Sequence, residues 1–149
     1  MGNPAIIPVI LLILIITGCS PASHLERGKA YLDNNQYDRS ITELERAANE
    51  KGDLYYYIDT YSHLGEAYAK NGRTSQALSV YRNALQMIHL RLREISSQRM
   101  GIRRELNSKS KAKAPGRQEE DMRLGDEEWK LKESAADIKS KLDSLSEMK

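Results

Sequence analysis

Two stretches of the chain repeat one pattern, and this repetition constrains its fold more than any other feature. "GKAYLDNNQYDRSITELERA" at residues 28–47 returns as "GEAYAKNGRTSQALSVYRNA" at residues 65–84. Small residues match small ones and large apolar residues match each other. The matched pairs are Gly28 with Gly65, Ala30 with Ala67, Tyr31 with Tyr68, Ser40 with Ala77, Ile41 with Leu78, Leu44 with Tyr81 and Ala47 with Ala84.

The pattern resembles the tetratricopeptide repeat, in which small residues lie where two helices cross. This resemblance covers about residues 22–91 and implies an all-α fold built from two helix-turn-helix repeats. The offset between the copies is 65 − 28 = 37 residues, whereas the family usually repeats every ~34. We expect the extra residues within 49–60, where they would lengthen the helix that carries "DLYYYIDTY".

Local signals place the helix ends. Ser23 and Glu26 form a capping box at the start of the first helix, and Asn34-Asn35 makes the following turn. Asp53 is predicted to cap a helix that runs through Lys70 and ends at Asn71-Gly72. The apolar side chains of that helix recur at helical spacing and predict its core face: Tyr57, Ile58, Tyr61, Leu64 and Tyr68.

The fourth helix is predicted to start near Thr74 and to continue well beyond the repeat, to Asn107. Arg99 interrupts its apolar stripe, and Gly101 weakens the helix by ~1 kcal/mol. The stripe consists of Leu78, Tyr81, Leu85, Ile88, Leu92, Ile95, Ile102 and Leu106.

The remaining chain divides into a charged linker at residues 108–125 and an amphipathic C-terminal helix at residues 126–149. Apolar residues in this helix alternate spacings of four and three, which is typical of a coiled-coil seam. They are Leu131, Ala135, Ile138, Leu142 and Leu145. Such a helix either closes the exposed end of a repeat domain, here residues 22–107, or docks on another protein.

One side of the helix that precedes Asn71 is polar throughout. By the resemblance, the first helix of each repeat lines a concave groove that binds partners. The first copy would contribute Lys29 and Asp33, and the second Asp59, Ser62, His63, Glu66 and Lys70. The alternative is that these side chains are simply a solvated face.

The N-terminal segment has the pattern of an export signal. Residues 6–16 are eleven consecutive residues that carry no charged or polar side chain and include one proline, and a membrane-spanning helix needs about 20. They are followed by Ile-Thr-Gly-Cys at residues 16–19, which resembles the lipobox of bacterial lipoproteins. The resemblance implies a signal peptide at residues 1–18 and a lipid on Cys19, although the segment before residue 6 lacks Lys and Arg.

Two alternatives to lipidation remain: cleavage after Ala22, which would release a soluble protein, or an inert buried thiol at Cys19. No second cysteine exists to form an intrachain disulfide. Ser20 resembles the enterobacterial signal for transfer to the outer membrane. We therefore expect a bacterial cell-envelope protein, at the periplasmic face of the outer membrane rather than the inner one in a Gram-negative cell.

The net charge of +2 conceals a segregation of charge along the chain. Residues 91–117 contain nine Lys or Arg and two Glu, whereas residues 118–128 contain six acids and one Arg. Export argues against nucleic acid as the partner, so an anionic lipid surface or an acidic envelope protein is predicted to contact the arginines; the alternative is a solubilising face partly neutralised by the acids. These are Arg91, Arg93, Arg99, Arg103 and Arg104.

No catalytic constellation is evident. His24, His63 and His89 lack a metal-ligand spacing, and no nucleophile motif is present. We predict no enzyme, no cofactor and no metal, but a lipid-anchored adaptor that binds envelope proteins or peptides and aids assembly of an envelope complex. The alternative is a self-associating structural lipoprotein, for instance a homodimer, because about three repeats are usually needed to bury a continuous core.

Overall fold

The computed structural model describes residues 23–107 and 115–147. Every regular element within these residues is an α-helix, which confirms the predicted all-α architecture. The elements are α2 (His24–Asp33), α3 (Tyr37–Ala48), α4 (Leu54–Lys70), α5 (Thr74–Asn107) and α6 (Pro115–Glu147). The predicted signal peptide and Cys19 lie outside the described residues.

The two helix-turn-helix units use the same turn. Asn35, at φ 58°, and Gly72, at φ 76°, both have left-handed backbones and are 72 − 35 = 37 residues apart. After each turn an amide donates back to a tyrosine carbonyl: Gln36 to Tyr31 at 2.8 Å, and Arg73 to Tyr68 at 2.8 Å. This pairing satisfies carbonyls at the end of the helix and reverses the chain. The repeat seen in the sequence is therefore a repeat of backbone geometry.

Glycine lets the two helices of each unit approach closely. A Cβ atom on Gly28 would lie 2.5 Å from Cγ of Leu44, and one on Gly65 would lie 2.5 Å from Cε1 of Tyr81. The buried Ser40 hydroxyl donates to the Gly28 carbonyl at 2.8 Å, which ties α3 to α2. The matched small and large residues of the sequence repeat are thus the two sides of these crossings.

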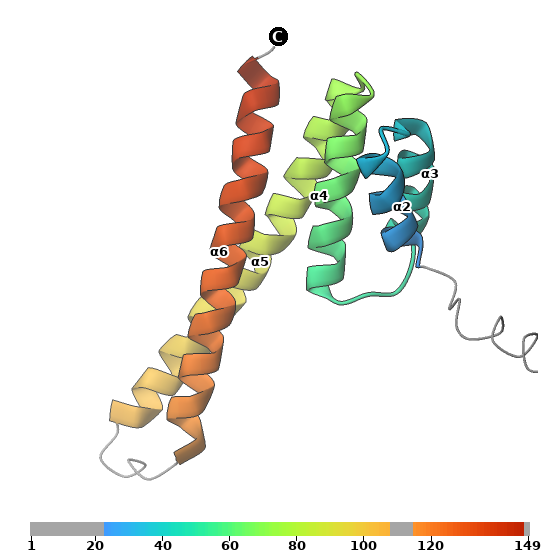
Figure 1. Cartoon of the computed structure of the whole chain (residues 1–149). Helices are drawn as coiled ribbons and strands as arrows, with labels where there is room; N and C mark the ends of the chain where they lie inside the picture. The colour runs from blue at the N-terminus through green and yellow to red at the C-terminus, as the bar shows by residue number, and fades with distance from the viewer. Residues whose placement is uncertain (1–22, 108–114, 148–149) are drawn as a thin grey trace, which may run out of the picture.

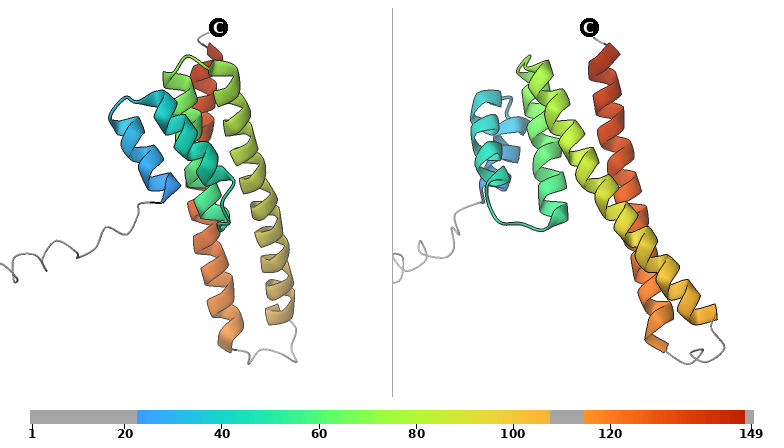
Figure 2. Two further views of the ribbon diagram at one scale, coloured as in Figure 1. Left: turned by 90° about the vertical axis from the view of Figure 1, so that its right-hand side faces the viewer. Right: turned by 180° about the vertical axis from the view of Figure 1, so that it is seen from behind.

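Helix α5 continues beyond the second repeat and forms a long antiparallel hairpin with α6 (Figures 1 and 2). Its buried residues are spaced by seven on both helices, as in a coiled coil. They are Ile88, Ile95 and Ile102 on α5, and Leu124, Leu131 and Ile138 on α6. Leu85, Leu92 and Leu106 of α5 and Ala135, Leu142 and Leu145 of α6 pack partly buried against them.

Arg99, which interrupts the apolar stripe of α5, is matched by acids on α6. Its guanidinium contacts Asp121 at 2.8 Å and Glu128 at 2.5 Å, and all three side chains are about three-quarters buried, at 22%, 23% and 24% exposed. Asp121 and Glu128 raise the pKa of Arg99. In turn Arg99 lowers the pKa of Asp121, and Lys132 and Arg99 together lower that of Glu128. A charged layer therefore replaces an apolar one at this point of the seam.

The start predicted for the C-terminal helix, residue 126, is wrong. Helix α6 begins at Pro115, so residues 115–125 are helical rather than linker. Proline is favourable in the first turn of a helix, where its missing N–H is not needed. Leu124, 3% exposed, also continues the seven-residue spacing of the seam. The acidic block read as linker is the part of the helix that pairs with Arg99.

The apolar stripe of the C-terminal helix packs into the hydrophobic core, and α6 contacts both α5 and α4. Of the two roles predicted for this helix, closure of the array therefore describes the structure, because the stripe that would dock on another protein is already covered. No helix in the described part of the chain has the length and apolarity needed to cross a bilayer.

Two glycine substitutions should have opposite effects on stability. Gly65→Ala should lower the free energy of unfolding by about 1–3 kcal/mol, because the ring of Tyr81, 2% exposed, has no room to move away from the new methyl group. Gly101→Ala should raise it by about 1 kcal/mol, since an exposed helix position with no neighbouring atom gains helix propensity. Urea denaturation followed by circular dichroism measures both; equal effects would contradict the crossing described here.

A charge swap tests the charged layer. Arg99→Glu should cost about 2 kcal/mol, because three carboxylates would then meet in a partly buried site. Adding Glu128→Arg should restore about half of the loss, whereas Arg104→Glu, the same change at an exposed position of α5, should cost little. The melting temperatures of the parent and the three variants measure these effects. A double variant no more stable than Arg99→Glu would refute the pairing.

Candidate functional site

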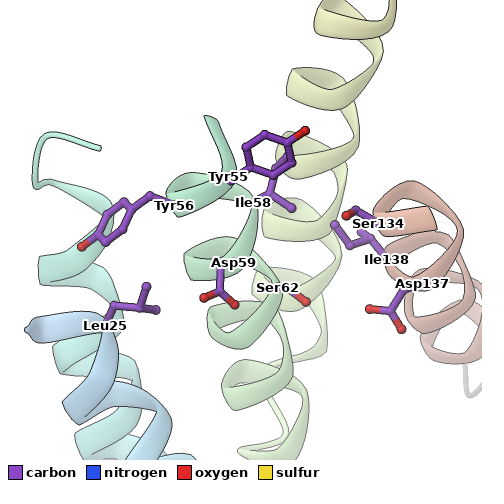
Figure 3. A pocket seen from close by; sticks show the side chains of 9 residues that line it. All are labelled: Leu25, Tyr55, Tyr56, Ile58, Asp59, Ser62, Ser134, Asp137 and Ile138. Carbon is purple, nitrogen blue, oxygen red and sulfur yellow. The ribbon is translucent and has the colours of Figure 1, made fainter. Parts of the chain in front are cut away.

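A pocket of about 490 Å³ opens between α2, α4 and α6 (Figure 3). Its floor and one side are apolar, and carboxylate and hydroxyl groups lie on the walls. The lining residues are Leu25 of α2, Tyr55, Tyr56, Ile58, Asp59 and Ser62 of α4, and Ser134, Asp137 and Ile138 of α6.

The extra length of the second repeat supplies a large part of this pocket. Helix α4 starts 65 − 54 = 11 residues before Gly65, whereas α2 starts 28 − 24 = 4 residues before Gly28. The predicted lengthening of this helix is thus confirmed. Tyr55, Tyr56 and Ile58 belong to the additional turns, and the Asp53 carboxylate caps them by accepting from the Tyr56 amide at 2.8 Å.

Hydrogen bonds hold the tyrosine wall in place. The Tyr56 hydroxyl donates to Glu50 at 2.6 Å, and the Tyr57 hydroxyl donates to the carbonyl of the same residue at 2.8 Å. Burial, together with the Glu50 carboxylate, raises the pKa of Tyr56 to about 12. Tyr55 is 40% exposed, which leaves its ring accessible from the pocket.

Asp59 links the first helices of the two repeats. It accepts from Lys29 of α2 at 2.6 Å and lies 3.0 Å from Nδ1 of His63. Although burial opposes it, the contact with Asp59 raises the pKa of Lys29. This ionic contact links α2 to α4 beside the pocket.

Helix α6 completes the pocket from the other side. The ammonium group of Lys141 donates to the Ser62 hydroxyl at 3.2 Å and pairs with Asp137 at 2.9 Å. Because residues 62 and 141 are far apart in the sequence, only the folding of the hairpin brings this wall to the repeats. Figure 3 shows Ser134 and Asp137 on the side of α6 that is turned toward α4, whereas Asp59 lies on the side of α4 toward Leu25 of α2.

The predicted groove residues are divided by the structure. Asp59 and Ser62 line the pocket, and Lys29 and His63 contact Asp59. Three others lie outside the lining: Glu66 and Lys70 pair with each other at 2.9 Å, and Asp33 is exposed. The prediction did not include Leu25, Tyr55, Tyr56, Ile58, Ser134, Asp137 or Ile138. Ile58 and Ile138 had been assigned to core stripes, and their spacing carries no signal that they also border a pocket.

The predicted basic surface is also divided. Arg91 makes two hydrogen bonds to Glu127, at 2.7 and 3.0 Å, and Glu127 and Glu94 raise its pKa further. Like Arg99, it is therefore engaged by acids of the same chain. Arg103 lies 3.8 Å from Asp121, and Arg93 and Arg104 are exposed with no ion pair among the described residues. Within residues 23–107 and 115–147, no group of three His, Cys, Asp or Glu side chains could hold a metal ion.

The family model described as tetratricopeptide repeat matches residues 21–55 and 58–88. These two stretches, which contain the two helix-turn-helix units, are similar to tetratricopeptide repeats. Comparison with curated proteins and with solved structures finds no match. Tetratricopeptide repeats serve as scaffolds for protein–protein interaction, and here α2 and α4, the first helices of the two repeats, both face the pocket. The third wall, α6, lies beyond the matched residues.

Proposed function

We propose that this protein is an adaptor that holds a segment of a partner protein in the α2/α4/α6 pocket while an N-terminal lipid confines it to a bacterial envelope membrane. The observation that carries the binding role is the pocket itself, which presents the exposed ring of Tyr55 above nearly buried aliphatic side chains on the interaction face of the tetratricopeptide repeats. Its volume lies at the lower end of the range of ligand sites, about 300–1,000 Å³. It therefore suits a few side chains of a peptide rather than a whole helix.

The lining indicates which side chains fit. An apolar side chain placed against Leu25, Tyr55 and Ile138 would gain about 1.5–3 kcal/mol from burial. Asp59 and Asp137 carry acceptors only, so they favour groups that donate, either backbone amides or a Lys or Arg of the partner. The preferred ligand is thus a peptide with one bulky apolar residue next to a donor.

The pocket is preorganised for such a ligand. Tyr56 is held by Glu50, Asp59 by Lys29, and Ser62 by Lys141, so little side-chain freedom remains to be lost on binding. Binding would be a simple equilibrium, with no covalent step. A lipid at Cys19 would add to it by confining the complex to two dimensions and raising the effective concentration.

Self-association is the weaker proposal. Two repeats need a further element to cover the open end of their core, and a second copy could supply it. Helix α6 already buries the apolar stripe of α5 within the chain, with Leu131 and Ile138 at most 1% exposed. Helix α6 therefore provides the cover that a second copy would otherwise supply.

The envelope location rests on the sequence. The apolar run at residues 6–16 and Ile-Thr-Gly-Cys at residues 16–19 support lipid attachment at Cys19, and Ser20 supports the periplasmic face of the outer membrane in a Gram-negative host. Acyl chains contribute about 0.8 kcal/mol per buried methylene, so two or more make an anchor that is in practice permanent.

Blocking the pocket should abolish peptide binding. Peptides selected on the full-length protein from a random library should bind Ser134→Tyr about tenfold more weakly or worse, because the ring would fill the opening from α6. Ser140→Tyr, at an exposed position of the same helix, should bind them normally. Both variants should melt like the parent. Undiminished binding by Ser134→Tyr would show that the pocket is not the site.

Lipid attachment is tested by labelling. In a Gram-negative host fed radioactive palmitate, the parent chain and Ser20→Ala should incorporate label and partition with detergent-solubilised membranes. Cys19→Ala should do neither, or should remain uncleaved, because the chain has no other thiol. A processed Cys19→Ala protein that still fractionates with membranes would contradict the lipid anchor.

A further inference from the structure

The α5/α6 hairpin has two flanks beside its seam, and they differ. One flank faces the repeats, because Tyr55 of α4 lines a cleft together with Arg91, Arg123, Asp126, Glu127 and Lys130. We call the opposite side the outward flank. It consists of Arg93, Ser96, Met100 and Arg103 on α5, and Met122, Gly125, Trp129 and Lys132 on α6.

Spacing and contacts place these residues on one surface. Each set of four is spaced by three, four and three, which is one face of a helix. A cleft across the seam is lined by Ser96, Met100 and Arg103 together with Glu128 of α6. On the α6 side, Gly125 lies beside the Arg99 guanidinium, and Lys132 pairs with Glu128 at 2.6 Å. The two faces therefore meet along the seam.

The outward flank exposes an unusual amount of apolar surface. Met100 is 53% exposed, Met122 65% and Trp129 63%, and they are three of the five large apolar side chains exposed in the described chain. Single exposed apolar residues need no explanation, but a group on one face marks an interaction site. Trp and Arg are the residues most enriched in the energetic centres of protein interfaces, and Met adapts to varied partners.

Charge distinguishes the two flanks. The outward flank carries Arg93, Arg103 and Lys132 and no acid. The flank that faces the repeats has the same number of cations, but it also carries four acids. Its cations are Arg91, Arg123 and Lys130, and its acids are Glu94, Glu105, Glu120 and Glu127. Arg93 makes no ion pair among the described residues, and the contact of Arg103 with Asp121 is long at 3.8 Å. The outward flank is thus apolar and basic; Lys132 is paired with Glu128 of the seam, whereas Arg93 and, at its long contact distance, Arg103 keep most of their charge available.

We propose that the outward flank binds an acidic amphipathic segment of a second protein. Its exposed Met and Trp side chains would bury the apolar face of that segment, and its cations would meet the acids. A second copy of this chain is the wrong occupant, because a twofold contact would place the same cations against one another.

The lipid proposed at Cys19 also argues against the anchoring membrane as the occupant. Four peptide steps separate Cys19 from Ser23, a reach of about 14 Å. Helix α2 contacts α3 and α4 but neither helix of the hairpin, so α4 lies between α2 and the hairpin (Figure 1). The membrane would therefore lie on the side of the repeats. Only this argument against the membrane rests on the proposed function, because it uses the lipid at Cys19.

Trp129 is the single tryptophan of the chain, so its fluorescence reports directly on the outward flank. A synthetic amphipathic helix of Leu and Glu, added to the full-length protein, should shift the emission to the blue in a saturable way, and added salt should weaken binding. The same peptide with Lys in place of Glu should cause no shift. Phosphatidylglycerol vesicles, if they shifted the emission as strongly as the acidic peptide, would overturn the choice of a protein partner.

Matched charge reversals locate the contact. Arg93→Glu with Arg103→Glu should weaken binding of the acidic peptide about tenfold or more, since attraction becomes repulsion. Arg123→Glu with Lys130→Glu changes the net charge equally on the other flank and should alter binding by less than about twofold. No shift with the acidic peptide, or equal losses in the two double variants, would refute the proposal. Ser134→Tyr should bind this peptide normally, so failure here is distinct from failure of the pocket.

Discussion

The register of α6 on α5 is set where Arg99 meets Asp121 and Glu128, and the pocket depends on that register. The apolar residues of the seam repeat every seven positions and would fit equally well after a slip of one heptad. Because Asp121 and Glu128 are themselves seven residues apart, such a slip would leave Arg99 with only one of its two acids, and the other acid would lose its ion pair in a partly buried site. The charged layer therefore selects one alignment, and this alignment brings Ser134, Asp137 and Ile138 opposite α4.

The second repeat differs from the first in the greater length of its first helix. Helix α4 starts 65 − 54 = 11 residues before its crossing glycine, against 28 − 24 = 4 for α2, and the added turns carry the tyrosines of the pocket wall. The repeats alone would leave this wall facing solvent. Helix α6 converts it into a pocket while it covers the end of the array, so a single element both stabilises the fold and shapes the site.

Charge is distributed so that the two flanks of the hairpin serve different purposes. On the side of the repeats, Arg91 and Glu127 satisfy each other and hold α6 in place. On the outward flank, Arg93, Arg103 and Lys132 accompany Met100, Met122 and Trp129, and Glu128 of the seam pairs with Lys132. Some charged side chains of the basic run and the acidic block thus form ion pairs within the hairpin. Others remain on its surface, where a partner could contact them.

The sequence by itself determined the local features: the helices of the repeats, their turns at Asn35 and Gly72, the long fourth helix and the lengthened α4. These depend on spacing, caps and small residues, which act over a few positions. The start of α6 and the partners of Arg91 and Arg99 were decided by tertiary structure, because a run of acids is helix or linker according to the cations it meets. The pocket depends on tertiary structure more than any of these features. Residues such as Ile58 and Ile138 show the same helical periodicity whether they are sealed in a core or border an opening, and only the placement of α6 against α4 makes that distinction.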